Sequence, residues 1–438
     1  MSKKIKRLFT KSTIFLLSIL FSLSASEILI RAFSPKPSKR LGHNQLFVEY
    51  DPLLGWRKIP NKKGKHVKYE YEISESMNSK GIRGPEYSYD KIYNEYRILI
   101  LGDSFAEGYT VEFNELFSEV LKRELNNKGD KYYEVINTGT AGYSTDQEFL
   151  FFQNEGKKYA PDLTILMFYQ NDVWYNNRNK YWRGYKPLFK LEDGELRLTN
   201  VPVLKLETQS NQTHYITTKN TQHMKIRNTM AVFPRIKKWL YEKSYLCNFI
   251  TDRIRNTYYL HALVIKLGLT EKNIQKEDDE RNNENGIDDK IGLIPDEFRV
   301  WAKVYNTEIR DAWKITEAII IKLKEETTAV GSKLLVFYNP DQASIYDEEW
   351  QATKRKYGIS DKSWSTDLVG IELEAVCKRN NIDFINPTAT FRAEANKIKI
   401  EGGRLYFIKD GHWNVNGHKF VGEILTKYFN TNYSMNNK

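Results

Sequence analysis

The stretch RILILGDSFAEG, residues 97–108, decides the fold of this chain. It opens on a short apolar run that ends at Gly102, which is typical of a strand buried inside a parallel sheet. Asp103 and Ser104 follow at once, and such residues favour the start of a helix. The stretch therefore predicts a buried strand, a sharp turn and a helix, which together begin an α/β fold.

The same alternation continues on the C-terminal side and returns near the end of the chain. Apolar runs at 133–136, 163–168, 333–338 and 382–385 predict four more strands. Amphipathic stretches predict helices at about 115–127, 145–158, 366–379 and 416–429. The sequence therefore predicts a three-layer αβα sandwich with a five-stranded parallel sheet.

The predicted sheet divides the chain into four parts. Residues 93–172 and 330–430 form the α/β domain, and residues 34–92 form a linker and a small lead-in segment. Residues 173–329 interrupt the alternation and are expected to form a mostly helical insertion, with helices at about 229–268 and 295–328. An acidic, amide-rich stretch at 271–290 between them is expected to be a loop.

The first 33 residues predict export. Basic residues precede an apolar run over residues 12–25, and this order leaves the N-terminus in the cytoplasm and the rest outside. A run of about 14 residues suits the core of a signal peptide better than a full span. Residues 28–30 extend the apolar pattern, so a retained membrane anchor is the alternative. The protein is expected either to be secreted or to be anchored in the inner membrane, facing the periplasm.

The composition excludes several classes of function. The net charge is +11, but Lys and Arg are scattered, so no nucleic-acid partner is expected. Two cysteines, Cys247 and Cys377, lie far apart and are expected to be free thiols. Since no Cys/His pattern indicates a metal site, neither a metal nor a cofactor is expected.

The candidate chemistry lies in the segments that follow the predicted strands, because ligands of open α/β sheets collect at the carboxyl ends of the strands. Ser104 directly follows the first strand, on a turn that exposes its hydroxyl. Near the C-terminus, Asp410 and His412 form DGH just before the last helix. Among seven histidines, only His412 has an acid so close within a Gly/Asn turn, so His412 is the expected base and Asp410 its orienting acid.

Two further loops offer hydrogen-bond donors. Gly142 lies in the glycine-containing loop after the second strand, where the backbone can approach a ligand closely. Asn171 follows the third strand, and its amide is able to donate to an oxyanion. Each feature taken alone is an ordinary turn residue, and the order of all the features along the chain carries the argument.

These four segments resemble the sequence blocks of the SGNH hydrolases, also called GDSL-type esterases. The matching segments are GDSFAEG at 102–108, NTGTAG at 137–142, YQND at 169–172 and DGHWN at 410–414. The resemblance covers about 45–172 and 330–428, where GWR at 55–57 is similar to membrane-attached bacterial members. It implies the flavodoxin-like sandwich of that family.

The resemblance also implies roles for single residues. Ser104 would be the nucleophile, His412 the base and Asp410 its orienting carboxylate. The oxyanion donors would be the N–H groups of Ser104 and Gly142 and the side chain of Asn171. The single residue between Asp410 and His412, followed by Trp413, is similar to the branch that acetylates exopolysaccharides.

The expected function is therefore a serine ester hydrolase acting on O-acyl esters, foremost O-acetyl esters, of cell-surface carbohydrate. An O-acetyltransferase with the same triad is one alternative, and a non-catalytic glycan-binding or assembly protein is another. Trp174, Tyr175 and Trp182 follow Asn171, and they either stack on sugar rings or pack the insertion. Asp103 is expected to stabilise its turn, and His418 to pack or cap the last helix.

Overall fold

The computed structural model describes residues 3–33, 47–68, 70–127, 131–181, 184–205, 244–255, 260, 263 and 294–433. The chain divides into two compact units. The first comprises residues 1–40 and 208–271, and the second comprises residues 41–207 and 272–438. The predicted acidic loop at 271–290, most of the predicted helix at 229–268 and the linker over 34–46 lie outside the described residues.

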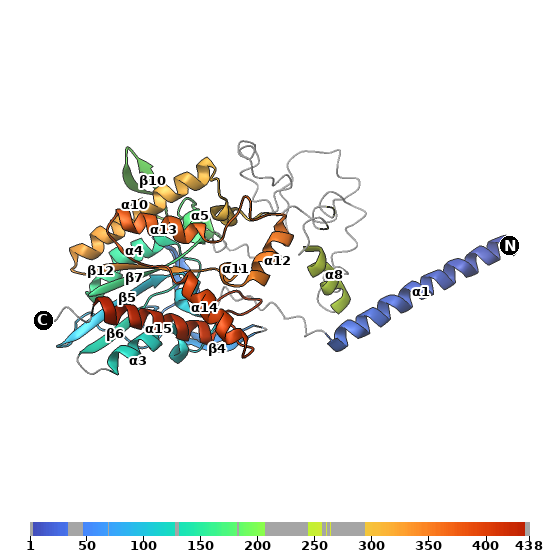
Figure 1. The fold of residues 1–438 in the computed structure, drawn as a ribbon, viewed down its shortest axis with the longest axis horizontal. Helices are drawn as coiled ribbons and strands as arrows, with labels where there is room; N and C mark the ends of the chain where they lie inside the picture. The colour runs from blue at the N-terminus through green and yellow to red at the C-terminus, as the bar shows by residue number, and fades with distance from the viewer. Residues whose placement is uncertain are drawn as a thin grey trace. The chain divides into compact units, whose positions relative to one another are not determined.

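A five-stranded parallel sheet forms the centre of the second unit, as the sequence predicts (Figure 1). In spatial order its strands are β13 (Asp383–Ile385), β12 (Lys333–Asn339), β7 (Leu163–Tyr169), β5 (Glu95–Gly102) and β6 (Tyr132–Asn137). β5 pairs with β6 on one side and with β7 on the other. The strand order therefore reverses at β5, and in α/β proteins such a switch point opens the crevice that holds the ligand.

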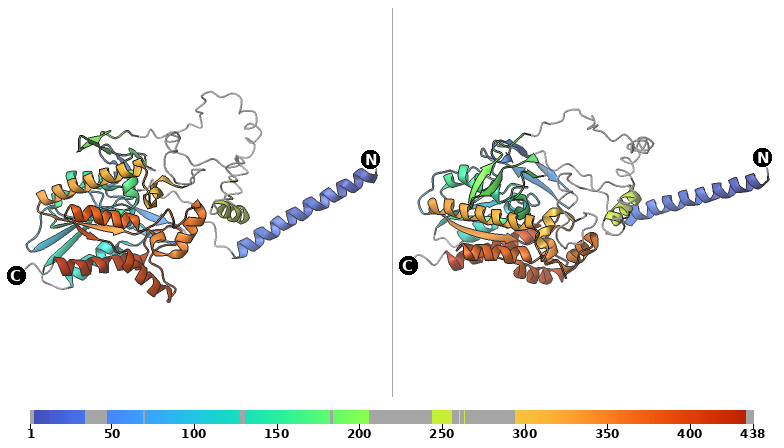
Figure 2. Two further views of the ribbon diagram at one scale, coloured as in Figure 1. Left: turned by 45° about the horizontal axis from the view of Figure 1, so that its top comes forward. Right: turned by 90° about the horizontal axis from the view of Figure 1, so that it is seen from above.

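Helices cover both faces of the sheet, which makes three layers (Figures 1 and 2). One face carries α4 (Thr145–Asn154), α10 (Thr307–Ala329) and α13 (Leu368–Arg379). The other carries α3 (Phe117–Asn126), α14 (Thr388–Lys399) and α15 (Val415–Asn432).

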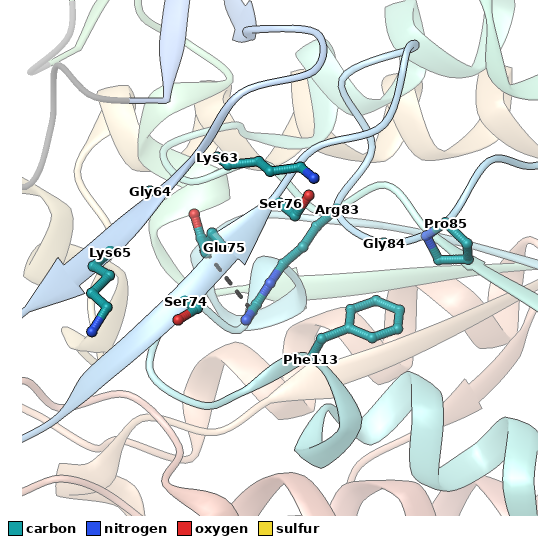
Figure 3. Close-up of a pocket in the computed structure, with 10 residues that line it drawn as sticks. All are labelled: Lys63, Gly64, Lys65, Ser74, Glu75, Ser76, Arg83, Gly84, Pro85 and Phe113. Atoms are coloured by element: carbon teal, nitrogen blue, oxygen red, sulfur yellow. Dashed lines mark ion pairs between the residues drawn. The ribbon is translucent and has the colours of Figure 1, made fainter.

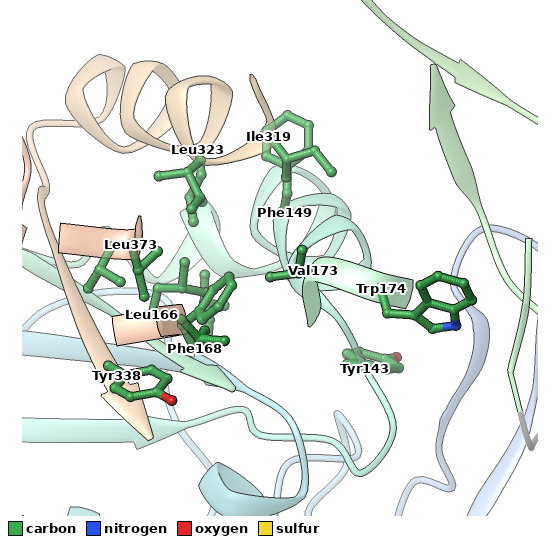
Figure 4. Packing of buried hydrophobic residues seen from close by; sticks show 14 of the residues in the cluster. Tyr143, Phe149, Leu166, Phe168, Val173, Trp174, Ile319, Leu323, Tyr338 and Leu373 are labelled. Atoms are coloured by element: carbon green, nitrogen blue, oxygen red, sulfur yellow. The ribbon is translucent and has the colours of Figure 1, made fainter. Parts of the chain in front are cut away.

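Successive side chains of β5 point to opposite faces of the sheet, as the two-residue period of a strand requires. Leu99 and Leu101 belong to the core under α4 and α10, whereas Ile98 and Ile100 belong to the core under α3 and α15. Figure 4 shows the first of these cores, with side chains of α4 and α10 packed over Leu166 and Phe168 of β7.

Short elements connect and flank these layers. They are the helices α2 (Ser104–Glu107), α5 (Asn171–Tyr175), α11 (Gln342–Ile345) and α12 (Asp347–Tyr357), and 3₁₀ turns at Phe113–Glu115, Gly156–Tyr159 and Asp296–Trp301. The lead-in segment contains two antiparallel hairpins, β1 (Val48–Asp51) with β2 (Gly55–Lys58), and β3 (Lys63–Val67) with β4 (Glu72–Ser76).

The region expected to be a helical insertion contains other structure as well. It forms two hairpins, β8 (Lys180–Tyr181) with β9 (Gly184–Tyr185), and β10 (Leu188–Glu192) with β11 (Glu195–Thr199). The helix expected at 295–328 is α10, which begins after the capping side chain of Asn306. Its apolar residues recur at helical spacing and bury one face against the sheet, so α10 is a layer of the α/β fold.

The first unit contains α1 (Lys3–Phe33) and α8 (Tyr245–Arg255). The Glu27 carboxylate of α1 accepts hydrogen bonds from the backbone N–H groups of Tyr245 and Leu246 at the start of α8. Within α1, residues 10–32 form a stretch of 23 residues that contains an 18-residue window of mean hydropathy 2.1, none of it buried. By length and composition this stretch suffices to cross a membrane, and it is longer than the apolar run read from the sequence. Cys247 and Cys377 are free thiols, as expected.

Candidate active site

Ser104 lies at the carboxyl end of β5, on the turn that leads into α2. Asp103 caps this turn, because its side chain accepts a hydrogen bond from the Phe105 N–H at 2.9 Å. This confirms the expected stabilising role of Asp103. Asp103 is buried, while Ser104 stays partly exposed. The turn therefore holds the serine hydroxyl at the edge of the sheet, where the strand order reverses.

His412 reaches Ser104 from the other end of the chain. Its Nε2 lies 2.8 Å from Ser104 Oγ, and its Nδ1 lies 2.7 Å from Asp410 Oδ1. The imidazole with its proton on Nδ1 fits both contacts, since Nδ1 then donates to the carboxylate and Nε2 accepts from the serine hydroxyl. Ser104, His412 and Asp410, all predicted from the sequence, therefore form one hydrogen-bonded chain.

Gly411 explains how a single intervening residue suffices between the acid and the base. Its φ of +82° lies in the left-handed region, which glycine adopts without strain. The backbone reverses there, so the Asp410 carboxylate points back at the His412 ring. The same loop buries Trp413 fully against Phe105, Phe117 and Phe391. Trp413 therefore anchors the loop to the core.

The charges of the hydrogen-bonded residues Ser104, His412 and Asp410 suit proton transfer. Burial raises the pKa of Asp410, but the hydrogen bond and charge of His412, with Tyr71 and Lys68, outweigh this effect and lower that pKa to about 2. Burial lowers the pKa of His412, but the hydrogen bond to Asp410 and its charge raise it above its usual value overall. Asp410 is therefore an anion at neutral pH, next to an imidazole whose proton affinity it increases.

The loop that carries Gly142 lies against the turn that carries Ser104. The Ala141 N–H donates to the Glu107 carboxylate, which also pairs with Lys58 Nζ. The fit is close at Gly139, since a Cβ there would lie 2.3 Å from the Glu107 nitrogen. Gly142 follows with a φ of +80°. α2 therefore positions the loop directly, and Gly142 lies three residues beyond the close approach at Gly139.

Asn171 begins α5 at the carboxyl end of β7, the other neighbour of β5. Its side chain forms a hydrogen bond with the hydroxyl of Tyr181. The preceding Tyr169 packs on Phe105, and its hydroxyl donates to Asp341 at 2.6 Å. The loops of Gly142 and Asn171 thus flank Ser104 from β6 and β7, the two strands on either side of β5.

Three contacts at the site come from residues that the sequence did not single out. The Tyr71 hydroxyl donates to Asp410 Oδ2 at 3.0 Å. The Tyr109 hydroxyl lies 3.2 Å from His412 Nδ1. Glu70 accepts hydrogen bonds from the backbone of the Asp410 loop. Since Glu70 and Tyr71 precede Asp410 by more than 300 positions, no local pattern points to them.

The aromatic residues expected to stack on sugar differ in exposure. Trp174 is 5% exposed and belongs to the hydrophobic core, with the Arg178 guanidinium 3.8 Å from its ring centroid. Of the two expected roles, its burial favours packing over stacking on a sugar ring. Tyr175 is partly buried and packs on Tyr181. Trp182 lies outside the described residues.

His418 packs in the core, as expected. It is 1% exposed and stacks on Phe117, and burial lowers its pKa to about 3. Across the described residues, no group of three or more His, Cys, Asp or Glu side chains is arranged to hold a metal ion.

A pocket of about 610 Å³ lies away from this chain of residues, over the β3–β4 hairpin (Figure 3). Glu75 and Arg83 form an ion pair at 3.9 Å among its lining residues. The others are Lys63, Gly64, Lys65, Ser74, Ser76, Gly84, Pro85 and Phe113. Because Ser104, Asp410 and His412 do not line it, it is not the site described above.

The Ser–His–Asp hydrogen-bonded chain lies at the switch point of an αβα sandwich. Its three residues and their contacts are those of a serine-hydrolase triad. Neither a protein-family model nor a curated protein sequence matches the chain. Similar solved structures include the acetyl xylan esterase AlAXEase, at 13% identity over 76% of this chain and 98% of that one, with a TM-score of 0.36.

Another is a lipase/acylhydrolase from Enterococcus faecalis, at 10% identity over 77% of this chain and 96% of that one, with a TM-score of 0.34. A catalytic mutant of an acetylxylan esterase from Geobacillus stearothermophilus is similar at 10% identity over 77% and 93%, with a TM-score of 0.33. At these values the likeness is too distant to assign an activity, which must be argued from the residues of the chain itself.

Proposed function

We propose that this protein is a serine-nucleophile ester hydrolase that removes O-acyl groups, foremost O-acetyl groups, from cell-surface carbohydrate. One observation carries the proposal: Ser104 Oγ, His412 and Asp410 form a continuous hydrogen-bonded chain with contacts of 2.8 and 2.7 Å. A serine hydroxyl is a weak nucleophile until a base takes its proton, and this chain supplies the base and the group that orients it.

The reaction follows from the direction of the hydrogen bonds. Ser104 Oγ attacks the ester carbonyl while His412 Nε2 takes the hydroxyl proton. The imidazolium that forms is stabilised by Asp410, and it then gives the proton to the leaving sugar oxygen. Water next attacks the acyl-enzyme while His412 takes a proton from that water. His412 then returns the proton to Ser104 Oγ as the bond from the acyl carbon to Oγ breaks and the carboxylic acid leaves.

The negative charge of the tetrahedral intermediate needs donors. The two loops beside Ser104 supply them in this proposal, with the N–H groups of Ser104 and Gly142 and the amide of Asn171. Fixed donors of this kind stabilise the transition state without reorganising during the reaction.

The choice of carbohydrate esters rests on the sequence. The Asp–Gly–His–Trp order at 410–413 is similar to the branch that acetylates exopolysaccharides. An O-acetyltransferase would use the same acyl-enzyme and differ in the acceptor of the second step. A product assay with an acetyl donor and oligosaccharide acceptors separates the two reactions, because a transferase forms acetylated oligosaccharide and a hydrolase forms acetate.

Replacing the nucleophile tests the mechanism. Ser104→Ala removes the attacking oxygen, so turnover of an aryl acetate should fall by at least about 10³-fold, with the circular dichroism spectrum unchanged. Ser363→Ala, at an exposed serine, is the matched control and should retain full activity. A fluorophosphonate probe should label the wild type but not Ser104→Ala. Failure to label well-folded wild type would favour a non-catalytic glycan-binding protein.

A further inference from the structure

The lead-in segment contacts the loop that carries Asp410 and His412 through the turn between β3 and β4. The Glu70 carboxylate accepts three backbone N–H groups there, from Ile408 at 2.9 Å, Lys409 at 3.0 Å and Asp410 at 2.9 Å. A carboxylate that accepts three consecutive N–H groups makes charge-assisted bonds, which are stronger than neutral ones. Glu70 thus fixes the backbone of the residue that orients His412.

Tyr71 acts on the carboxylate itself. Its hydroxyl donates to Asp410 Oδ2, so the two oxygens of Asp410 have separate partners and Oδ1 is left to His412. The Tyr71 ring packs against Phe407 at 5.1 Å and Tyr109 at 6.4 Å, and only 9% of the residue is exposed. Its hydroxyl is therefore held in place by packing on both sides.

The loop at residues 407–411 depends on such outside contacts because few contacts within the loop stabilise it. Residues 407–411 form a turn closed by hydrogen bonds from the Phe407 N–H to the His412 carbonyl and from the Gly411 N–H to the Phe407 carbonyl. Ile408 is 57% exposed, so it contributes little burial to this turn. The contacts from Glu70 and Tyr71 therefore supply restraint that the loop does not supply itself.

We propose that Glu70 and Tyr71 are positioning residues of the hydrolase, which hold Asp410 so that its Oδ1 orients His412 towards Ser104. This inference rests on the proposed function. It makes the lead-in hairpin part of the catalytic machinery, although the hairpin carries no reacting group.

The two residues should affect the reaction differently. Loss of Glu70 lets the loop move, and a misplacement of about 1 Å can cost about 10²-fold in rate. Loss of the Tyr71 hydroxyl leaves the charge of Asp410 less stabilised. Asp410 then attracts the proton of His412 more strongly, so the pKa of His412 rises. The other charged or titratable groups near His412 are Asp103, Asp341, His418, Lys68 and Tyr109.

The experiment compares Glu70→Ala, Glu70→Gln and Tyr71→Phe with Glu72→Ala in the full chain. Glu72 lies on the same hairpin, but its carboxylate pairs with exposed Lys65, so it is the matched control. For aryl acetate, kcat should fall about 10- to 100-fold in Glu70→Ala and less in Glu70→Gln, with KM within about twofold. Glu72→Ala should match the wild type in both constants.

The pH profile separates positioning from a merely structural role. The base must be neutral, so activity is lost as pH falls through the pKa of His412. In Tyr71→Phe the acid limb of kcat/KM should move to higher pH by roughly half a unit. The limb should stay in place in Glu72→Ala. Unchanged kcat in Glu70→Ala together with an unmoved limb in Tyr71→Phe would overturn the inference.

A nuclear magnetic resonance measurement on ¹⁵N-histidine-labelled protein needs no turnover. The resonance of the Nδ1 proton of His412, which is hydrogen-bonded to Asp410, should lose intensity or shift in Glu70→Ala. The pKa of His412 should rise in Tyr71→Phe. If these changes appear while Ser104→Ala keeps full activity, the proposed function fails but Glu70 and Tyr71 still position the pair. If Ser104→Ala is inactive and no resonance changes, the positioning inference alone fails.

Discussion

At the residue scale, Asp410 has two distinct tasks in the proposed mechanism: it orients the imidazole and it supplies a negative charge. The first depends on the 2.7 Å contact to His412 Nδ1, and the second on a pKa that its surroundings lower to about 2. An amide in the same place keeps the shape but loses the charge, so it distinguishes the two tasks.

Asp410→Asn should lower kcat by about 10³- to 10⁴-fold, because the amide no longer enforces the productive tautomer or stabilises the imidazolium. It should also shift the acid limb of the residual activity to lower pH. The carboxylate is what raises the pKa of His412 against the effect of burial, so its loss lets that pKa fall. A pH–rate profile measures both effects, and an acid limb that moves upward would contradict this account.

Asn171→Ala tests the oxyanion donors. The loss of one donor should reduce kcat by about 10²- to 10³-fold, with KM changed little, because the interaction is made with the transition state. Asn177→Ala, on the turn that follows α5, is the matched control and should leave kcat unchanged. Steady-state kinetics with an aryl acetate are sufficient.

Local sequence was enough to predict that Ser104, Asp410 and His412 lie together, because a strand end and a DGH turn can each be recognised within a few residues. Glu70, Tyr71 and Tyr109 were not found, since their role depends on a contact across the chain. The sequence left open whether Trp174 stacks on sugar or packs, because aromatic composition does not distinguish an exposed ring from one buried under a guanidinium.

At the element scale, a buried ion pair connects the helices next to the loops that carry Gly142 and Asn171. Lys186, just after β9, pairs with Asp146 near the start of α4, and both side chains are fully buried. Lys186 Nζ also donates to the Tyr175 carbonyl of α5 at 2.9 Å. Burial lowers the pKa of Lys186 and raises that of Asp146. The pair therefore links α4, which follows Gly142, to α5, which begins at Asn171.

Lys186→Met should lower the free energy of unfolding by about 3 kcal/mol, because it leaves Asp146 buried without its cation. Lys190→Met, at an exposed residue of β10, should change it by less than about 0.5 kcal/mol. Urea unfolding followed by tryptophan fluorescence measures both values. Equal stability of the two variants would mean that the pair contributes nothing net.

The five strands were predicted to within about two residues, since each contains a short, mainly apolar run with a clear end. The short helices α11, α12 and α14 were missed. α12 is mainly polar and buries only Trp350 among its residues, so its sequence has a weak apolar stripe. α10 was found as a helix but placed in an insertion, because the helical period does not say which surface the apolar face covers.

At the scale of the whole molecule, α1 and the sheet belong to different compact units. The residues of the candidate site all lie in the second unit, so the chemistry should not depend on α1. Among the residues that the structure describes, the apolar stretch of α1 over residues 10–32 has the length and composition of a membrane span.

Deleting residues 1–33 should release the protein from membranes and leave kcat for an aryl acetate within about twofold of the full-length value. Fractionation by ultracentrifugation, followed by activity assays on pellet and supernatant, checks both. A matched chain with Leu20 and Phe21, at the middle of residues 10–32, changed to Lys should also lose membrane association, since a charge at the centre of a span costs about 2.5–3.5 kcal/mol. A truncated protein that stays in the pellet would place the attachment elsewhere.

The separation of 308 positions between Ser104 and His412 has a consequence for biosynthesis. During synthesis Ser104 is made 308 residues before His412. The Ser104 hydroxyl therefore has no base until the loop at residues 410–412 has folded against it. In the proposed enzyme, esterase activity therefore begins only after residues 410–412 have been synthesised and have folded. A chain whose synthesis has not yet reached His412 therefore cannot hydrolyse the acyl esters that it meets.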